Sequence, residues 1–293
     1  MTRHFLTGEE LSADELSTLL DRALELKKGR ARGEGANALA GRSLALVFEK
    51  PSTRTRVSLE VGVAELGGTP IVLRGDELQL ARGESIGDTA RSLSRYVHAI
   101  AIRSGSHENV VELAEGASVP VINALTPAHH PCQALADLLT LRERFGDLGG
   151  LRVAYVGDGN NVARSLATLG RTAGVEVAIA SPEGYRIEPG LAAEDTDDPR
   201  AAVAGADAIY TDVWVSMGAE EGAKVRRTDL APYKVDSELV GAASDRAIVL
   251  HCLPAHPGEE IAEDVLYGER SAVWDQAANR LHAQKALLEM LVG

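Results

Sequence analysis

The chain has 293 residues, of which 45% are apolar, 25% are charged and only 4% are aromatic. This length favours two domains of about 150 residues each, and the apolar share excludes an intrinsically disordered chain. The formal net charge of −13, from 43 acidic and 30 basic residues, argues against broad electrostatic binding to nucleic acid or to an anionic membrane. Any anion must therefore be bound by a local group of arginines and backbone N–H groups.

Several classes of protein are excluded by what the sequence lacks. The two cysteines, Cys132 and Cys252, are far apart without C-x-x-C spacing, so neither a disulfide framework nor a zinc finger is indicated. The first residues contain no apolar signal core, and no stretch approaches the about 20 apolar residues that a membrane span needs. We therefore expect a cytoplasmic protein with no membrane or nucleic-acid partner, and we find no cluster with metal-ligand spacing.

The first half of the chain alternates between predicted helices and strands. A helix is predicted to begin after Ser12, which has capping-box spacing to Glu15, and to end at Gly29. Short apolar runs at 44–48, 70–73, 99–102 and 119–122 predict strands buried on both faces. Helices are predicted over 57–66, near 86–95, near 107–115 and over 131–145.

The second half repeats this alternation. Strands are predicted at 151–156, 175–180, 206–213 and 247–250, with helices over 161–173 and 276–291 and a surface connection over 181–199. The pattern predicts an α/β fold of two doubly wound parallel-sheet domains, with the active site in the crevice between them. We assign residues 1–145 to the first domain and 146–275 to the second, and we expect the C-terminal helix 276–293 to pack back on the first.

The strongest local signal for chemistry is the segment 52–56, Ser-Thr-Arg-Thr-Arg, between a buried strand and a helix. A helix N-terminus offers free N–H groups and a positive dipole, to which this segment adds two guanidinium groups and three hydroxyls. The alternative is a well-capped helix whose arginines face solvent. We favour an anion site, because parallel sheets bind ligands where their strands end.

Four ordered motifs resemble those of the aspartate/ornithine carbamoyltransferase family. Residues 48–56 (FEKPSTRTR), followed by Glu60 and by residues 66–68 (LGG), resemble the carbamoyl-phosphate loop of that family. Residues 130–133 (HPCQ) with 136–137 (AD) resemble its second carbamoyl-phosphate segment. The segment 212–218 (DVWVSMG) and the segment 251–254 (HCLP) resemble those of its ornithine-specific members.

This resemblance implies transfer of the carbamoyl group of carbamoyl phosphate to the δ-amine of L-ornithine, which yields L-citrulline and phosphate in arginine or urea-cycle type metabolism. It implies no metal and no cofactor, and a homotrimer or a multiple of trimers. The catalytic residues it implies are Arg54, Arg103, His130 and Cys252. The carbamoyl-phosphate ligands it implies are Ser52, Thr53, Arg54, Thr55, Gln79, Arg103, His130, Pro131, Cys132, Gln133, Cys252, Leu253 and Arg280. The ornithine ligands it implies are Asn161, Asp212, Ser216 and Met217.

Several of these residues also have a structural explanation when they are considered singly. These explanations are a salt bridge for Arg103, a helix cap for His130, a strand-end cap for Asp212, a core position for Met217, an inert buried thiol for Cys252 and a solvated loop for Gln79. The resemblance implies that Gln79 reaches a neighbouring subunit. The family commonly has Glu where this chain has Ala278, which leaves the orientation of Arg280 open.

Alternative functions are also open at this point. Gly157 and Gly159 partly match a dinucleotide fingerprint, but Val162 stands where that motif needs its third glycine. A sibling carbamoyltransferase could use putrescine, an acylated ornithine or aspartate. Aspartate is disfavoured, because aspartate-specific relatives have Pro at the position of Cys252. A metabolite-binding scaffold without activity is the alternative from a different class of protein.

Overall fold

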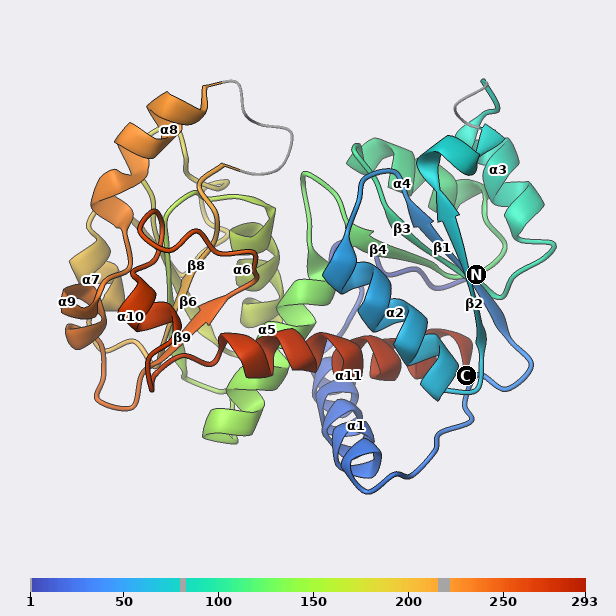
Figure 1. Cartoon of the computed structure of the whole chain (residues 1–293), viewed down its shortest axis with the longest axis horizontal. Coiled ribbons are helices and arrows are strands. Elements are labelled where there is room, and N and C mark those ends of the chain that lie inside the picture. The colour runs from blue at the N-terminus through green and yellow to red at the C-terminus, as the bar shows by residue number, and fades with distance from the viewer. Residues whose placement is uncertain (1, 80–82, 216–221) are drawn as a thin grey trace. The chain divides into compact units, whose positions relative to one another are not determined.

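The computed structural model describes residues 2–79, 83–215 and 222–293 (Figure 1). The chain forms two compact units, of which the first comprises Met1–Leu139 with Ala278–Gly293 and the second comprises Thr140–Ala277. The boundaries between the units fall inside two long helices, α5 (Pro131–Phe145) and α11 (Val273–Val292). The division inside α5 lies six residues before the boundary assigned from sequence.

The first unit contains a four-stranded parallel sheet with the strand order β2-β1-β3-β4. Its strands are β1 (Ser43–Phe48), β2 (Thr69–Arg74), β3 (Ala99–Arg103) and β4 (Val121–Leu125). Its other elements are α1 (Ala13–Ala31), α2 (Thr53–Glu65), the 3-10 turn η1 (Gly75–Glu77), α3 (Ile86–Leu93) and α4 (His107–Gly116). The connections run from β1 outward to β2 and then back past β1 to β3, so right-handed crossovers place α2 on one face and α3 and α4 on the other.

The second unit contains a five-stranded parallel sheet with the strand order β7-β6-β5-β8-β9. Its strands are β5 (Arg152–Val156), β6 (Glu176–Ala180), β7 (Glu194–Thr196), β8 (Ala208–Thr211) and β9 (Ile248–His251). Its other elements are α6 (Asn161–Ala173), α7 (Pro199–Val203), α8 (Ala223–Leu230), η3 (Ala231–Tyr233), α9 (Ser237–Gly241) and α10 (Glu263–Leu266). The predicted α/β class, with a doubly wound parallel sheet in each half of the chain, is confirmed.

Local sequence signals account for the elements that were predicted well. Ser12 and Glu15 form the expected capping box, in which each side chain accepts a hydrogen bond from the other residue's backbone N–H. Strand β1 is buried from Leu44 to Phe48, as expected of a continuous apolar run. These signals are reliable here because each depends only on residues that are close in sequence.

The sequence prediction was wrong in several places. Helix α2, predicted over 57–66, begins at Thr53, and α1 continues past its predicted end at Gly29 to Ala31. The expected surface connection 181–199 contains β7, an edge strand with the sequence Glu-Asp-Thr that lacks the apolar run of a central strand. The short helices α7, α8, α9 and α10 were not predicted, because helices of four to eight residues show too few turns for an apolar period. The final helix begins at Val273, three residues before its predicted start.

No helix among the described residues is long and apolar enough to cross a membrane.

Candidate functional site

In each sheet the chain reverses its winding direction between two neighbouring strands. In the first unit this happens between β1 and β3, and in the second unit between β5 and β8. The loops that follow these strands diverge, so their first residues line an opening at the sheet edge where parallel sheets bind ligands. The sequence-predicted residues Ser52 and Arg103 lie at the first of these positions, and Asp212 lies at the second.

Ser52 and Arg103 are brought together by this topology. Arg103 is the last residue of β3, and its Nη1 donates a hydrogen bond of 2.9 Å to Oγ of Ser52. Ser52 holds the N-cap position of α2 but makes no capping hydrogen bond with its side chain. The Ser52 hydroxyl therefore contacts the guanidinium group of Arg103 instead of capping the helix. The first N–H groups of α2 need hydrogen-bond acceptors from elsewhere.

The first turn of α2 carries positive charge where helices normally prefer negative charge. It contains no acidic residue, and Thr53 and Arg54 are both exposed. Arg54 makes no hydrogen bond or ion pair within the described part of the chain. An arginine at the positive end of a helix dipole is unfavourable in isolation, and a bound anion would reverse the sign of this interaction.

Thr55, His130 and Gln133 converge on Arg280, which is buried in α11 of the same unit. Arg280 donates from Nη2 to Oγ1 of Thr55 over 2.7 Å and from Nη1 to Oε1 of Gln133, and its Nη1 lies 3.5 Å from Nε2 of His130. The orientation of Arg280, which the sequence left open at Ala278, is thus defined by three side chains of its own unit.

Burial and two neighbouring cations keep His130 neutral. The pKa of His130 lies well below its usual value, first because the ring is buried and then because Arg280 and Arg103 repel a positive charge. Gln133 is also buried, and its Nε2 donates a hydrogen bond of 2.8 Å to Asp137. At neutral pH the imidazole can therefore donate or accept one hydrogen bond without contributing charge.

Three further residues were predicted to bind carbamoyl phosphate. Pro131 and Cys132 lie at the start of α5, and Gln79 lies in a different part of the first unit. Pro131 is the first residue of α5, and the thiol of Cys132 is buried and donates to the carbonyl of Asn123 over 3.4 Å. Burial raises the pKa of Cys132 to about 12, so this side chain is an inert thiol. Gln79 is exposed and follows η1.

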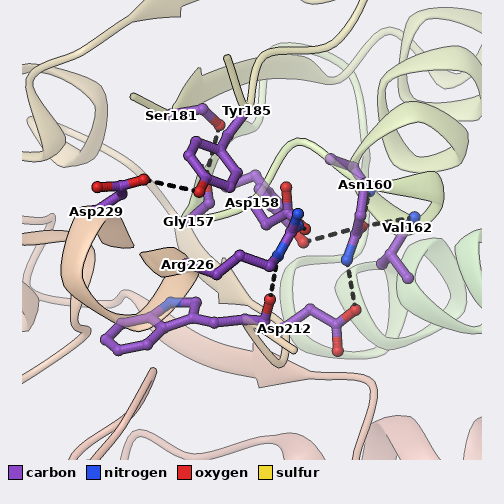
Figure 2. A network of polar contacts seen from close by, with 12 residues as sticks. Gly157, Asp158, Asn160, Val162, Ser181, Tyr185, Asp212, Arg226 and Asp229 are labelled. Atoms are coloured by element: carbon purple, nitrogen blue, oxygen red, sulfur yellow. Dashed lines mark hydrogen bonds and ion pairs between the residues drawn. The ribbon is translucent and has the colours of Figure 1, made fainter. Parts of the chain in front are cut away.

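Asp212 is the centre of the polar group in the second unit. It directly follows β8, its carboxylate is buried, and Figure 2 shows it close to Asn160. Its Oδ1 accepts a hydrogen bond of 2.8 Å from the thiol of Cys252, and its Oδ2 accepts one of 2.8 Å from Nδ2 of Asn160. Both donors are neutral, and Asp212 forms no ion pair within residues 2–79, 83–215 and 222–293.

Asn160 belongs to this polar group and was not singled out from the sequence, where the resemblance pointed to its neighbour Asn161. Asn160 is the N-cap of α6, and its Oδ1 accepts hydrogen bonds from the backbone N–H groups of Val162 and Ala163. The same side chain therefore caps the helix and orients Asp212. Asn161 is the first residue of α6 and is partly buried, while Ser216 and Met217 lie outside the described residues.

Gly159, next to Asp158, allows the backbone to pack closely against the segment that contains Tyr185. A Cβ atom on Gly159 would lie 2.5 Å from the carbonyl oxygen of Tyr185 and 2.9 Å from the backbone nitrogen of Ile187. The N–H of Gly159 donates to that same carbonyl over 2.7 Å. This contact explains the glycine without a dinucleotide.

Cys252 and Leu253 follow β9 in a turn whose shape is held by His251. The N–H of Leu253 donates to Nδ1 of His251 over 2.9 Å, and Nε2 of His251 lies 3.2 Å from the buried carboxylate of Glu260. Leu253 has a φ of 58°, in the left-handed region. The backbone in this turn is thus fixed by a buried histidine with both ring nitrogens engaged.

Among the residues that the structure describes, two groups of side chains bring metal-ligand atoms within 4.8 Å of one another. They are Asp212, His251 and Cys252, and His256, Glu259 and Glu260. In the first group His251 uses both ring nitrogens for internal contacts. In the second group Glu259 forms an ion pair with Arg227 over 2.9 Å.

Known proteins resemble this chain along its whole length. The family model described as the carbamoyl-P binding domain of aspartate/ornithine carbamoyltransferase matches residues 3–143, and the model of the Asp/Orn binding domain matches residues 149–291. The chain belongs to the aspartate/ornithine carbamoyltransferase family.

Within this family the most similar relatives have one name in common. The ornithine carbamoyltransferase of Acidothermus cellulolyticus is 55% identical over 100% of this chain and 97% of its own length. That of Parafrankia sp. is 53% identical over 99% of this chain and 96% of its own. The structure of ornithine carbamoyltransferase from Pyrococcus furiosus superposes with a TM-score of 0.95 at 47% identity, covering 99% of this chain and 97% of the other.

Proposed function

We propose that this chain transfers the carbamoyl group of carbamoyl phosphate to the δ-amine of L-ornithine, which yields L-citrulline and phosphate. The observation that carries this proposal is identity above 50%, along essentially the full chain, to proteins named ornithine carbamoyltransferase. Membership of a transferase family alone leaves the amine open, so the ornithine-like segments at 212–218 and 251–254 also enter the argument.

Carbamoyl phosphate is proposed to bind the first unit. Its phosphate dianion requires cations and N–H donors, and these are supplied at the start of α2 by Ser52, Thr53, Arg54 and Thr55. Supporting this assignment, the exposed guanidinium of Arg54 stands at a helix N-terminus that has no side-chain cap. The other residues of the first unit that are proposed for this substrate are Gln79, Arg103, His130, Pro131, Cys132, Gln133 and Arg280, and Cys252 and Leu253 are proposed for it from the second unit.

The carbonyl oxygen of carbamoyl phosphate becomes negative when an amine attacks the carbon. We assign its stabilisation to Thr55, Arg103 and His130, with Gln133 binding the carbamoyl nitrogen. Donors that are held in place before the reaction lower the barrier most, because they need not reorganise as charge develops. The buried contacts of Arg280 with Thr55 and Gln133 supply this rigidity.

Ornithine is proposed to bind the second unit. The carboxylate of Asp212 offers a negative charge to an ammonium group, and Asn161, Ser216 and Met217 are proposed for the amino-acid end. The δ-nitrogen attacks as the neutral amine. A C–N bond then forms, the C–O bond to phosphate breaks, and the proton lost from nitrogen can leave on the phosphate. Cys252, hydrogen-bonded to Asp212, is proposed to contact the reacting amine.

We also infer a trimer-based assembly and a cytoplasmic location. A cavity of about 750 Å³ beside Ser52 is lined by Val57 and Arg74 among others, and the exposed side chains of Val57 and Ile71 are compatible with a subunit contact there. Both cysteines are free thiols, as expected in a reducing compartment. Light scattering after size-exclusion chromatography tests the assembly, and a monomer would contradict it.

The test of the proposed function is carbamoyl transfer by the purified protein to ornithine, putrescine, an acylated ornithine and aspartate in parallel. Release of phosphate and formation of the carbamoylated amine are both measured. We expect product with ornithine. Activity with another amine alone would identify a sibling enzyme, and binding of carbamoyl phosphate without transfer to any amine would indicate a scaffold.

A variant of Cys252 tests whether this residue contacts the reacting amine of ornithine. Cys252→Ser is expected to weaken the response to ornithine more than the affinity for carbamoyl phosphate, because the serine hydroxyl donates to Asp212 with a different length and acidity. The two substrates are titrated separately. An unchanged ornithine response would remove Cys252 from the site.

A further inference from the structure

Two buried carboxylates stand at neighbouring strand ends of the second unit. Asp158 follows β5 and is 7% exposed, and Asp212 follows β8 and is 6% exposed. The pKa of Asp158 is raised above its usual value, mainly by burial and also by the negative charge of Asp212, while Arg226 acts in the opposite direction. Two such charges in one region are costly unless one of them has a cationic partner.

Arg226 of α8 is that partner for Asp158, as Figure 2 shows. Its Nη2 forms an ion pair with Oδ2 of Asp158, and its Nε donates to the carbonyl of Trp214 over 3.0 Å. Its guanidinium group also lies over the ring of Tyr185, 4.9 Å from the ring centroid. One guanidinium group thus connects the segments that follow β5, β6 and β8.

The backbone links this ion pair to the asparagine that holds Asp212. The N–H of Asn160 donates to the carbonyl of Asp158 over 2.7 Å, and Gly159 between them is packed against the carbonyl of Tyr185. A displacement of Asp158 would therefore move Asn160, whose side-chain amide donates to Asp212.

We propose that Arg226 is a positioning residue for ornithine: it neutralises Asp158 and fixes the strand ends, so that Asp212 is the carboxylate left to pair with the substrate's ammonium group. This inference rests on the proposed function and adds a residue to it. Asp212 accepts hydrogen bonds only from neutral groups in the described chain, whereas Asp158 has a guanidinium partner. The two carboxylates, similar in burial, are thereby given different roles.

The test compares Arg226→Gln with Arg227→Gln. Arg227 is the next residue of α8, and the side chains of its ion pair with Glu259 are 48% and 34% exposed, so the control removes the same charge from the same helix at a less buried pair. We expect Arg226→Gln to raise the KM for ornithine about tenfold or more, since small displacements of binding groups have effects of this size. The Kd for carbamoyl phosphate should stay unchanged in both variants.

A rescue experiment distinguishes positioning from direct contact. Removing both charges, in Asp158→Asn combined with Arg226→Gln, removes the unpaired charge that Arg226→Gln alone would leave on Asp158 beside Asp212, so we expect most of the loss in KM to be recovered. Arg226→Lys retains the charge and should have a smaller effect than Arg226→Gln. Thermal unfolding of each variant establishes that the measured protein is folded.

The outcomes separate this inference from the function on which it rests. An unchanged ornithine KM in folded, active Arg226→Gln would overturn the inference alone. A raised KM that Asp158→Asn does not rescue would also overturn it, because Arg226 would then contact the substrate or act on the fold in general. Failure of the parent protein to carbamoylate ornithine would overturn the proposed function and, with it, this inference.

Discussion

Both units contain a doubly wound parallel sheet, and they place opposite charges at the point where the winding direction reverses. Between β1 and β3 the first unit has the guanidinium of Arg103 against Ser52, and between β5 and β8 the second has the carboxylate of Asp212 against Asn160. The helices that follow also differ. Asn160 caps α6 with its own side chain, whereas Ser52 leaves the start of α2 without such a cap.

This difference teaches how one fold is adapted to two kinds of ligand. An open helix start with arginines favours an anion, and a closed helix start beside a buried carboxylate favours a cation. Parallel sheets present helix starts and loop side chains at the carboxyl ends of their strands, so a few loop residues determine the sign of the charge there. Because the overall charge is −13, an anion depends on the local positive group in the first unit for its attraction to the protein.

The largest expected effect comes from removing the exposed cation of the first unit. Arg54→Ala should lower turnover by about 10²–10³-fold or more, because a charged donor to the leaving group is lost. Stability should change by less than about 0.5 kcal/mol, because the side chain is exposed and makes no hydrogen bond or ion pair with the described residues. Steady-state kinetics and thermal unfolding measure both quantities.

Arg91→Ala is the control for this variant. Arg91 is also exposed in the first unit, where its ion pair with Asp88 lies on the surface of α3. Its removal should leave turnover unchanged. If Arg54→Ala behaved like Arg91→Ala, the anion site at α2 would be refuted.

Asp212→Asn is expected to have the next largest effect, confined to the other substrate. The variant keeps the size of the side chain and removes the charge, so kcat/KM for ornithine should fall about 10- to 100-fold. Binding of carbamoyl phosphate, measured by calorimetry, should not change. Equal losses for both substrates would break the comparison between a cation-binding and an anion-binding unit.

Variants of Asn160 can separate the two roles of its side chain, which are to cap α6 and to orient Asp212. Asn160→Ser retains a capping hydroxyl but lacks the amide that donates to Asp212, so we expect the KM for ornithine to rise about fivefold with little change in stability. Asn160→Ala loses both functions and should also lower the free energy of unfolding by about 1 kcal/mol. Equal ornithine KM in Asn160→Ser and the parent would show that the amide contact has no role in binding.

The smallest effect on activity is expected from a variant of His282. This variant tests the effect of the positively charged side chains that surround His282 in the first unit. Burial, followed by the charges of Lys27, Lys285 and Arg30, lowers the pKa of His282 to about 4. The unfolded chain, with a pKa near 6.5, binds more protons between these values, so this group makes stability rise as pH increases from about 4 to about 6.5.

Replacement of His282 by Gln should remove this contribution, which is at most about 3 kcal/mol. Chemical unfolding of the parent and His282→Gln at pH 4.5 and pH 7 measures it, and turnover at pH 7 should be unchanged. The same difference in stability between the two proteins at both pH values would contradict the assignment.

Much of the fold was predictable because its signals are local. The apolar run at β1 and the pairing of Ser12 with Glu15 depend on residues a few positions apart. Strand β7 and the short helices of the second unit were missed, because their residues are polar or too few to show a period. They form because the neighbouring sheet supplies their partners.

The candidate site was predictable to a smaller extent. Sequence motifs pointed to Ser52, Arg103 and Asp212 as candidate site residues, and the structure places Arg103 at the end of a strand and Ser52 and Asp212 in the loops that follow strands. The motifs could not identify Asn160 as the donor to Asp212, nor Arg226 as the partner of Asp158, which is 68 residues away. No spacing rule connects residues that different strands bring together.

The sequence by itself determined the alternation of strands and helices, the acidic overall charge and the segments that bear the family's motifs, because these depend on composition and on neighbours along the chain. Only the tertiary structure decided which side chains meet. Arg280 contacts Thr55 from 225 positions away, and Cys252 contacts Asp212 from 40 positions away. Hydrogen bonds and ion pairs act over a few ångströms, so their partners are chosen by the packing of the elements and not by the order of the residues.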